Sequence, residues 1–547
     1  MMSSVLLTSC MEEEVEATDG RTTRSVVLAM VSEKEVSPET EKQIEDALNA
    51  ITKARYKTMV DIRYYSQEEY FSEMVALIER IEEEKANGDQ DGILGGTVET
   101  EASDEETVVD EFYGYAEYKY PEIKENQLDI FFISGLDMYK YFNDYYNGRS
   151  WLAPLDSELS TMGSKIYDYI FDSYMKGLIT ASSNVTYAIP NNVLTGEYTY
   201  LLVDKALATK YQYSVEVPKW TSITDAELFI NDIAKYEAGV APVYGMPVPT
   251  NVHSWSYKVG TMGNITTFTN QPGTFSVFGG NVYSNSTIES PLAFDKALNV
   301  NYGRQLKVIQ GLKDNNYIFT ELEDGQKFAV GFMKGNEATV EKYREDYEIL
   351  VLETPKITTE DLFGYMFGIY AESENETTRN MEILMLMQTD ETVRNILQYG
   401  IEGVHYTIDD KTGVLRRLNE DYMMDVKKTG NVLLAHAEEG ENPKSVEYMK
   451  LALQDATVYP AISFNCSSES GVIAEWVEAE NALSKKYADK IAACKSVAEL
   501  EDLIKEYNAD PELSSLYEGW SSATSGSHSP YSAYYRWMVD MGFIVED

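Results

Sequence analysis

Short apolar runs alternate with segments of helical periodicity over roughly the first 150 residues. The runs have the length and density of strands buried on both faces, and they occupy residues 24–31, 58–65 and 128–134. Two intervening segments open with helix-start residues, Ser37 followed by Pro38 and the capping box from Ser66 to Glu69. This alternation predicts an α/β fold with an open parallel sheet flanked by helices.

A second block with the same alternation begins near residue 225. Helices are predicted at 225–237, 337–347 and 376–388, and strands at 327–333, 348–352 and 363–371. From Gly471 to Tyr507 the pattern is helical, and the chain ends in a tail rich in Tyr and Ser. The segment 87–111 has many acids and few bulky residues, which predicts an acidic, mobile insertion.

Ligands of open α/β sheets bind beyond the carboxyl ends of the strands. In the first block these ends fall at 32–34, 64–66 and 134–137. The sequence therefore predicts that polar side chains from these three loops contribute to a ligand site.

The charge balance argues against two kinds of partner. The 547 residues include 45 Lys and Arg against 91 Asp and Glu, which gives a net charge of −46. Nucleic acid and anionic lipid surfaces would be repelled, so neither is expected to bind through charge. The 41 Tyr residues add a different property, because tyrosine joins a flat apolar face to a polar tip that suits ring stacking at a wet interface.

No motif specifies a catalytic or metal centre. The 4 His residues lack metal-ligand spacing and no Cys-x-x-Cys occurs, so neither a metal nor a cofactor is expected. Nucleophile-elbow and phosphate-loop motifs are missing, and an enzyme is not expected. With 91 acids, some carboxylate pair at glycosidase spacing is unavoidable and carries no information. Cys466 and Cys494 could pair in an oxidising compartment or stay isolated as small apolar residues.

The N-terminal residues Leu7-Thr8-Ser9-Cys10 resemble a bacterial lipobox, and the acidic stretch 12–23 that follows resembles a lipoprotein tether. The segment before Cys10 is shorter than a full signal peptide. The longest apolar runs are of strand length, far below the roughly 20 residues of a membrane span. We expect a diacylated or triacylated Cys10 to anchor the chain to the outer face of the bacterial cell membrane.

Several segments resemble the family-1 extracellular solute-binding proteins, the receptors of ABC importers related to maltose-binding protein. The most specific is Tyr399–Tyr406, which reads Y-G-I-E-G-V-H-Y and resembles a signature of a lipoprotein branch of that family. Weaker matches keep the family order and lie at 187–192, 200–211, 364–369 and 388–391. In the third of these, Phe367 stands where the branch usually has Trp.

The resemblance implies a two-lobe periplasmic-binding-protein-like fold, with open sheets flanked by helices and crossing hinge segments. The expected layout is a lipobox and tether (1–23), lobe 1 (24–192), lobe 2 (193–362), a return to lobe 1 (363–410) and a C-terminal region of uncertain lobe (411–547). The implied function is capture of a mono- or oligosaccharide in the inter-lobe cleft by a monomer, and delivery to the permease subunits of an ABC importer. A glycoside hydrolase and a surface glycan-binding protein without transport remain the alternatives.

Candidate ligand-binding residues lie at strand ends, at the crossing segments and in one polar–aromatic loop, because saccharides need aromatic faces and hydrogen-bonding side chains. They are Glu33, Ser134, Asp137, Asn191, Asn192, Trp255, Tyr257 and Phe367. For each, an ordinary role in a turn or in packing is the alternative. Tyr399 and His405 are expected to fix a turn rather than to bind ligand.

Overall fold

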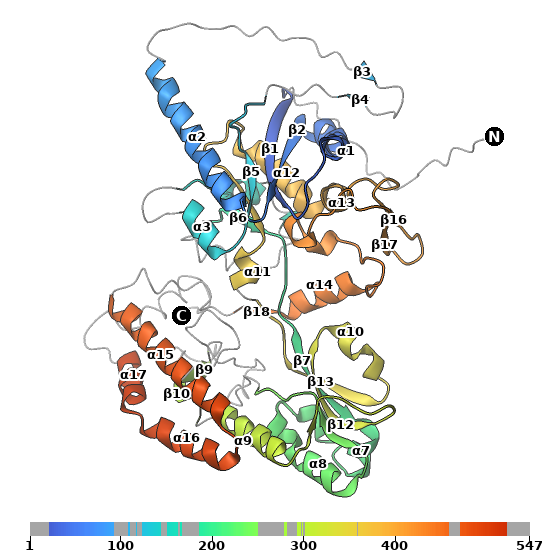
Figure 1. Ribbon diagram of the computed structural model, residues 1–547, viewed down its shortest axis with the longest axis vertical. Helices are drawn as coiled ribbons and strands as arrows, with labels where there is room; N and C mark the ends of the chain where they lie inside the picture. Colours follow the sequence, from blue (N-terminus) through green and yellow to red (C-terminus); the bar gives the residue numbers. More distant parts are fainter. Residues whose placement is uncertain are drawn as a thin grey trace, which may run out of the picture. The chain divides into compact units, whose positions relative to one another are not determined.

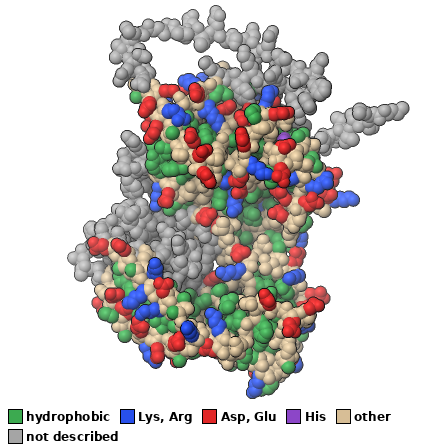
Figure 2. Space-filling view, in the orientation of Figure 1, with side chains coloured by type: hydrophobic (Ala, Val, Ile, Leu, Met, Phe, Trp, Pro, Cys, Tyr) green, Lys and Arg blue, Asp and Glu red, His purple; other side chains and the backbone are tan. Residues whose placement is uncertain are grey.

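The computed structural model describes residues 21–91, 108–109, 116–117, 123–143, 150–161, 165–166, 185–249, 278–281, 293–296, 298, 301–357, 359–458 and 471–521. The chain forms two compact units, which Figure 1 shows with their helices and strands. Unit 1 comprises Met1–Tyr174, Val185–Val193 and Leu362–Val446, and unit 2 comprises Met175–Asn184, Leu194–Asp361 and Glu447–Asp547. On the face shown in Figure 2, acidic side chains are interspersed with Lys and Arg over the described surface.

Unit 1 is built on a five-stranded sheet of order β2-β1-β5-β15-β6. Its strands are β1 (Arg24–Ser32), β2 (Thr58–Ser66), β5 (Ile130–Ile133), β6 (Ala188–Pro190) and β15 (Met366–Ile369). β1 is parallel to both β2 and β5, whereas β15 runs antiparallel to β5 and β6. The sheet is therefore mixed, and the predicted parallel arrangement holds only for its first three strands.

Unit 1 also contains helices and short strands. The helices are α1 (Pro38–Tyr56), α2 (Tyr70–Asp91), α3 (Leu136–Phe142), α4 (Asp156–Thr161), α12 (Thr377–Thr389) and α13 (Glu391–Tyr399). Two-residue and three-residue strands pair as β3 (Val108–Val109) with β4 (Ala116–Glu117) and as β16 (Tyr406–Ile408) with β17 (Leu415–Arg417). Single 3₁₀ turns lie at η6 (Val426–Lys428) and η7 (Val432–Leu434).

The helix-start predictions are confirmed at Ser37 and corrected at Ser66. Ser37 caps α1 by accepting a hydrogen bond from the Thr40 backbone N–H (3.2 Å). Ser66 Oγ accepts from the Glu69 N–H (3.3 Å), but the residues between them form a turn and α2 begins only at Tyr70. The predicted strand 363–371 is also shorter, because α11 (Thr359–Phe363) occupies its start.

Unit 2 has a second five-stranded sheet, of order β11-β8-β12-β7-β13. The strands are β7 (Tyr198–Asp204), β8 (Ala241–Tyr244), β11 (Ile318–Phe319), β12 (Phe328–Gly335) and β13 (Tyr347–Glu353). β8 is parallel to β11 and β12, and β7 is antiparallel to β12 and β13. Alternation along β7 sends Leu201 and Val203 to a core shared with α8 and α9, and Tyr198 and Tyr200 to a second, aromatic core.

The remaining elements of unit 2 include α7 (Lys205–Lys210), η2 (Val217–Lys219), α8 (Ile223–Tyr236), α9 (Asn301–Asp314), α10 (Glu337–Val340) and η5 (Glu341–Tyr343). Short strands pair as β9 (Phe278–Asn281) with β10 (Ala293–Lys296) and as β14 (Lys356–Ile357) with β18 (Thr457–Val458). The predicted helix 337–347 is in fact α10 followed by the 3₁₀ turn η5, because β13 already begins at Tyr347.

The C-terminal part contains α14 (Ser445–Asp455), α15 (Gly471–Ala493), α16 (Val497–Ala509) and α17 (Pro511–Ser521). The region 471–507 is helical as predicted, and it is divided into two helices, because Ser496 caps a new helix by accepting from the Glu499 N–H (3.2 Å). Cys494, near the end of α15, is a free half-buried thiol, and Cys466 lies outside the described residues.

Among the described helices, none is long and apolar enough to cross a membrane.

Asp510 joins these C-terminal helices. Its carboxylate accepts hydrogen bonds from Tyr487 Oη (2.6 Å), Lys486 Nζ (2.9 Å) and the Glu512 N–H (2.9 Å). Burial by itself would raise the pKa of Asp510, but the hydrogen bonds from Tyr487, Lys486 and the backbone outweigh it and lower the pKa to about 2.

We therefore expect the packing of α15 to α17 to lose stability on acidification. A carboxyl whose pKa is lower in the folded state stabilises that state above its unfolded pKa, near 4, and loses the effect as the pH falls towards 2. Hydrogen exchange of α17 amides between pH 5 and 2.5 measures this. Asp510→Asn should flatten the pH dependence, and an unchanged slope in the variant would contradict the assignment.

Candidate ligand-binding site

The carboxyl edge of the unit 1 sheet collects several predicted site residues. Glu33 follows β1 and Ser134 follows β5, and these two strands are parallel. β15 is antiparallel to both β5 and β6, so β6 runs in the direction of β5 and Asn191 leaves the sheet at the same edge. Asp137 is exposed in the first turn of α3. The topology thus brings residues from three distant parts of the sequence to one edge, as α/β sheets do at ligand sites.

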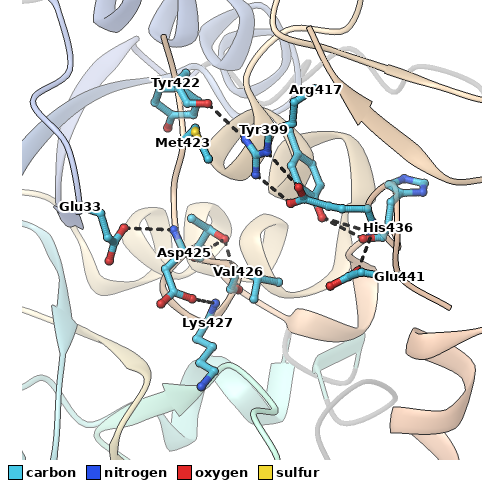
Figure 3. Close-up of polar contacts among 12 residues, drawn as sticks. Glu33, Tyr399, Arg417, Tyr422, Met423, Asp425, Val426, Lys427, His436 and Glu441 are labelled. Carbon is cyan, nitrogen blue, oxygen red and sulfur yellow. Dashed lines mark hydrogen bonds and ion pairs between the residues drawn. The ribbon is translucent and has the colours of Figure 1, made fainter. Parts of the chain in front are cut away.

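A segment that the sequence analysis gave no role covers this edge; we call residues 417–434 the covering segment. Lys428, only 7% exposed, forms an ion pair with Glu33 and donates to Gln67 Oε1 (2.8 Å). The Asp425 N–H donates to the other carboxylate oxygen of Glu33 (3.3 Å), as Figure 3 shows. Glu33 therefore holds the covering segment in place, and its charge is compensated within unit 1.

Two of the predicted ligand residues, Asn191 and Asn192, have no exposed surface. Asn191 Nδ2 donates to the Lys427 carbonyl (2.8 Å), and its Oδ1 accepts from Gln388 Nε2 (2.9 Å). Asn192 Nδ2 donates to Asn431 Oδ1 (2.9 Å). These contacts engage both asparagine side chains with α12 and the covering segment, inside unit 1.

The other predicted residues have different surroundings. Phe367 is fully buried in β15 and packs edge-on against Phe132, with ring centroids 5.4 Å apart. Ser134 is half-buried, and its backbone N–H faces Met138 Sδ at 3.3 Å. Trp255, Tyr257 and Cys10 lie outside the described residues. Among the described positions, the structure thus separates the edge residues Glu33, Ser134 and Asp137 from the buried ones.

The covering segment also supplies an aromatic–cation pair. Lys427 Nζ lies over the ring of Tyr365, 5.2 Å from its centroid, and Tyr365 is half-buried just before β15. In Figure 3 the Lys427 side chain points away from Glu33 and Tyr422. The sequence gave no reason to select either residue, because they are far apart in the chain and meet only in the folded unit.

The Tyr399–Tyr406 signature forms a fixed turn. Tyr399 Oη donates to the His436 carbonyl (3.2 Å), and His405 Nδ1 accepts from the Ile401 N–H (3.0 Å). Gly400 adopts φ 86°, and a Cβ there would overlap the His405 ring, so this position requires glycine. Burial lowers the pKa of His405, which favours the neutral imidazole that this hydrogen bond requires.

Unit 2 contains a cavity of about 420 Å³ at the carboxyl ends of its parallel strands β8, β11 and β12. It is lined by Tyr244, Gly245, Thr320, Phe332, Met333, Lys334, Thr339, Lys342 and Tyr343. Sequence reasoning missed all of them. The sequence offered one signal, the end of the predicted strand 327–333, because ligands of open α/β sheets bind beyond the carboxyl ends of the strands.

Buried aromatic side chains pack against the two tyrosines that line this cavity. Phe328 stacks on Tyr347 with centroids 4.4 Å apart, and it contacts the rings of Tyr244 (5.2 Å) and Tyr343 (5.7 Å). Both lining tyrosines are only half-buried, so part of each ring remains open. Half-exposed rings beside the hydroxyls of Thr320 and Thr339 offer the two kinds of contact that a saccharide makes.

Gly245 directly follows β8 at the cavity, with φ 79°, and its N–H donates to the Phe319 carbonyl (2.9 Å). A Cβ at this position would overlap the carbonyl oxygen of Phe332, which belongs to β12. We expect Gly245→Ala to destabilise unit 2 by about 2–4 kcal/mol, since both the backbone conformation and the strand contact are disturbed. Gly239→Ala is the control, because Gly239 has φ 87° but open space around it, and it should cost only about 1 kcal/mol. Equal melting temperatures of the two variants would contradict this account.

Within the described residues, no group of three or more His, Cys, Asp and Glu side chains is arranged to hold a metal ion.

Comparison with known proteins defines the fold. No family model matches the chain, and no curated protein matches its sequence. Among solved structures, the chain is similar to an N-glycan transport solute-binding protein from Streptococcus pneumoniae, at 16% identity, covering 94% of this chain and 99% of that one with a TM-score of 0.50. An extracellular solute-binding protein from Bifidobacterium longum subsp. infantis is 11% identical, with 95% and 98% covered and a TM-score of 0.48.

The chain has the fold of the extracellular solute-binding proteins of ABC transporters, and the predicted fold class is confirmed. Its two α/β units, each with a five-stranded sheet flanked by helices, are the two lobes that this fold implies.

Proposed function

We propose that the protein is an extracellular solute-binding receptor that captures a saccharide and delivers it to the permease subunits of an ABC importer. The observation that carries the proposal is the cavity at the carboxyl ends of β8, β11 and β12, with two half-exposed tyrosines and two threonines in its lining. In a fold of this class, that edge is where a ligand binds. The fold likeness to a protein named for N-glycan transport supports a carbohydrate over other polar solutes.

Isothermal titration calorimetry against a saccharide panel tests the proposal. The panel contains mannose–N-acetylglucosamine oligosaccharides, lactose-based oligosaccharides and fructo-oligosaccharides, and each mixture is analysed afterwards for products. Saturable binding with the sugar recovered intact supports the receptor. Hydrolysis of the sugar would replace it with the glycoside hydrolase, and tight binding of peptides with no saccharide binding would overturn the ligand class.

Uptake experiments distinguish an importer receptor from a surface glycan-binding protein without transport. An importer receptor should restore uptake of its sugar in a host strain that carries the matching permease, and deletion of the gene should abolish that uptake. Binding without any effect on uptake would favour the alternative, a surface glycan-binding protein. We also propose that the receptor works as a monomer, which light scattering of the purified chain tests.

We propose in addition that Cys10 anchors the protein to the outer face of the cell membrane. The motivation is the lipobox-like Leu7-Thr8-Ser9-Cys10 followed by an acidic tether. Expressed behind a full signal peptide, the protein should partition with membranes, and Cys10→Ser should release it, because a thioether-linked diacylglycerol supplies the two acyl chains that stable anchoring needs. Release of wild type and variant in equal amounts would refute the anchor, without bearing on sugar binding.

A further inference from the structure

The cavity in unit 2 differs in charge from the chain as a whole. Lys334 and Lys342 both line it, and none of its described lining residues is Asp or Glu. The whole chain has 91 acids against 45 basic residues, so a lining with basic residues and no acid runs against the overall composition. The described lining of the cavity thus carries two positive charges and no negative one, on a strongly acidic protein.

The charges of these lysines are not compensated by ion pairs with described residues. Lys342 Nζ lies over the ring of Tyr343, 4.9 Å from its centroid, and among the ion pairs of the described residues neither Lys342 nor Lys334 takes part. Glu337, the first residue of α10, forms an ion pair with Arg344 instead. Both lysine side chains are exposed, so they can reach a bound molecule without the cost of burial.

We propose that the unit 2 cavity recognises an anionic saccharide, one that carries a carboxylate or a sulfate group. The sugar ring contacts Tyr244 and Tyr343, its hydroxyls contact Thr320 and Thr339, and its acidic group lies between the ammonium groups of Lys334 and Lys342. Lysine is a flexible point charge without the fixed fork of arginine, so this arrangement accepts either kind of acidic group. The inference rests on the proposed function and adds to it the charge class of the ligand.

Matched pairs of sugars that differ only in the acidic group test the inference by titration calorimetry. The pairs are 3′-sialyllactose with its neutral methyl ester, 3′-sulfolactose with lactose, and digalacturonate with the corresponding neutral digalactoside. At low salt we expect at least one acidic member to bind about tenfold more tightly than its neutral partner. That advantage should shrink in about 0.5 M NaCl, because the lysines are exposed and their charges are screened.

Variants of the two lysines test whether the preference for acidic sugars arises in the cavity. The double variant Lys334→Gln with Lys342→Gln should lose about tenfold in affinity for the acidic sugar and change its affinity for the neutral partner less than twofold. Lys334→Arg with Lys342→Arg should retain the preference. The control is Lys313→Gln with Lys327→Gln, which removes two exposed lysines of unit 2 that do not line the cavity; Lys327 stands just before β12, at the opposite end of that strand.

The outcomes separate this inference from the function on which it rests. Neutral sugars that bind as tightly as their acidic partners would overturn the inference and leave the receptor standing. An acidic preference that the control variant removes as strongly as the cavity variant would overturn it as well, because a general charge effect would then explain it. Failure of every sugar to bind, acidic or neutral, would overturn the proposed function itself.

Discussion

Replacing Asp129 by alanine should lower the stability of unit 1 by about 3–5 kcal/mol, because a fully buried carboxylate with several donors is removed. Asp129 precedes β5, and its carboxylate accepts from the Val27 N–H (2.8 Å) and Gln127 Nε2 (2.8 Å). It also accepts from Asn375 Nδ2 (3.1 Å) and from the Ser373 hydroxyl. One side chain therefore joins β1, β5 and the loop after β15.

Calorimetry of the purified chain measures the effect as a drop of about 10 °C in the melting temperature of unit 1, at roughly 2–4 °C per kcal/mol for a unit of this size. Asp129→Asn should cost less, since its amide oxygen still accepts some of these bonds. The matched control is Asp410→Ala, an exposed acid in the same unit that should change the melting temperature by less than about 2 °C. Equal shifts for Asp129→Ala and Asp410→Ala would show that the buried network does not stabilise the unit.

Replacing Tyr343 by alanine should weaken saccharide binding by about 10–30-fold. A ring that overlaps a sugar face by about 60–80 Å² contributes about 1.5–2 kcal/mol at roughly 25 cal/mol per Å² of apolar surface removed from water. Each 1.4 kcal/mol or so changes affinity tenfold, which gives the predicted range. The prediction depends on the proposed function and on Tyr343 lining the cavity beside Lys342.

Tyr236→Ala is a close control for this experiment. Like Tyr343, Tyr236 is a tyrosine of unit 2 with a lysine over its ring, Lys235 at 4.8 Å. It is exposed, lies on α8 and does not line the cavity. Titrations are carried out well below the melting temperatures of both variants, because Tyr343 also packs on Phe328 and Tyr347 and its loss reduces stability. Wild-type affinity in Tyr343→Ala would exclude this ring from the binding surface.

Local signals in the sequence predicted much of the secondary structure. The apolar runs at 24–31 and 58–65 form β1 and β2, and Ser37 followed by Pro38 starts α1. These features are local, since strand burial and helix capping depend on neighbouring residues. The helical region 471–507 forms two helices separated at Ser496. The prediction was less accurate at 337–347, where the helix ends early at the 3₁₀ turn before β13.

The candidate site depended much more on tertiary structure. Sequence reasoning selected Glu33 from its place after a strand, and the structure keeps it at the sheet edge but pairs it with Lys428, 395 positions away. Asn191 and Phe367 were selected because they lie at the crossing segments that the family resemblance implies, yet both have no exposed surface. A sequence pattern shows that a residue follows a strand, but it does not show which distant segment covers that strand's end.

The sequence by itself determined that this protein is an acidic α/β chain and, through its resemblance to a known family, which fold to expect. Only the tertiary structure decided which side chains are available to a ligand. The lining of the unit 2 cavity comes from β8, β12, η5 and the residues between them, whose positions in the chain range from Tyr244 to Tyr343. The physical reason is that secondary structure follows from short-range periodicity and capping, whereas exposure at a site follows from long-range packing and from hydrogen bonds and ion pairs between distant segments.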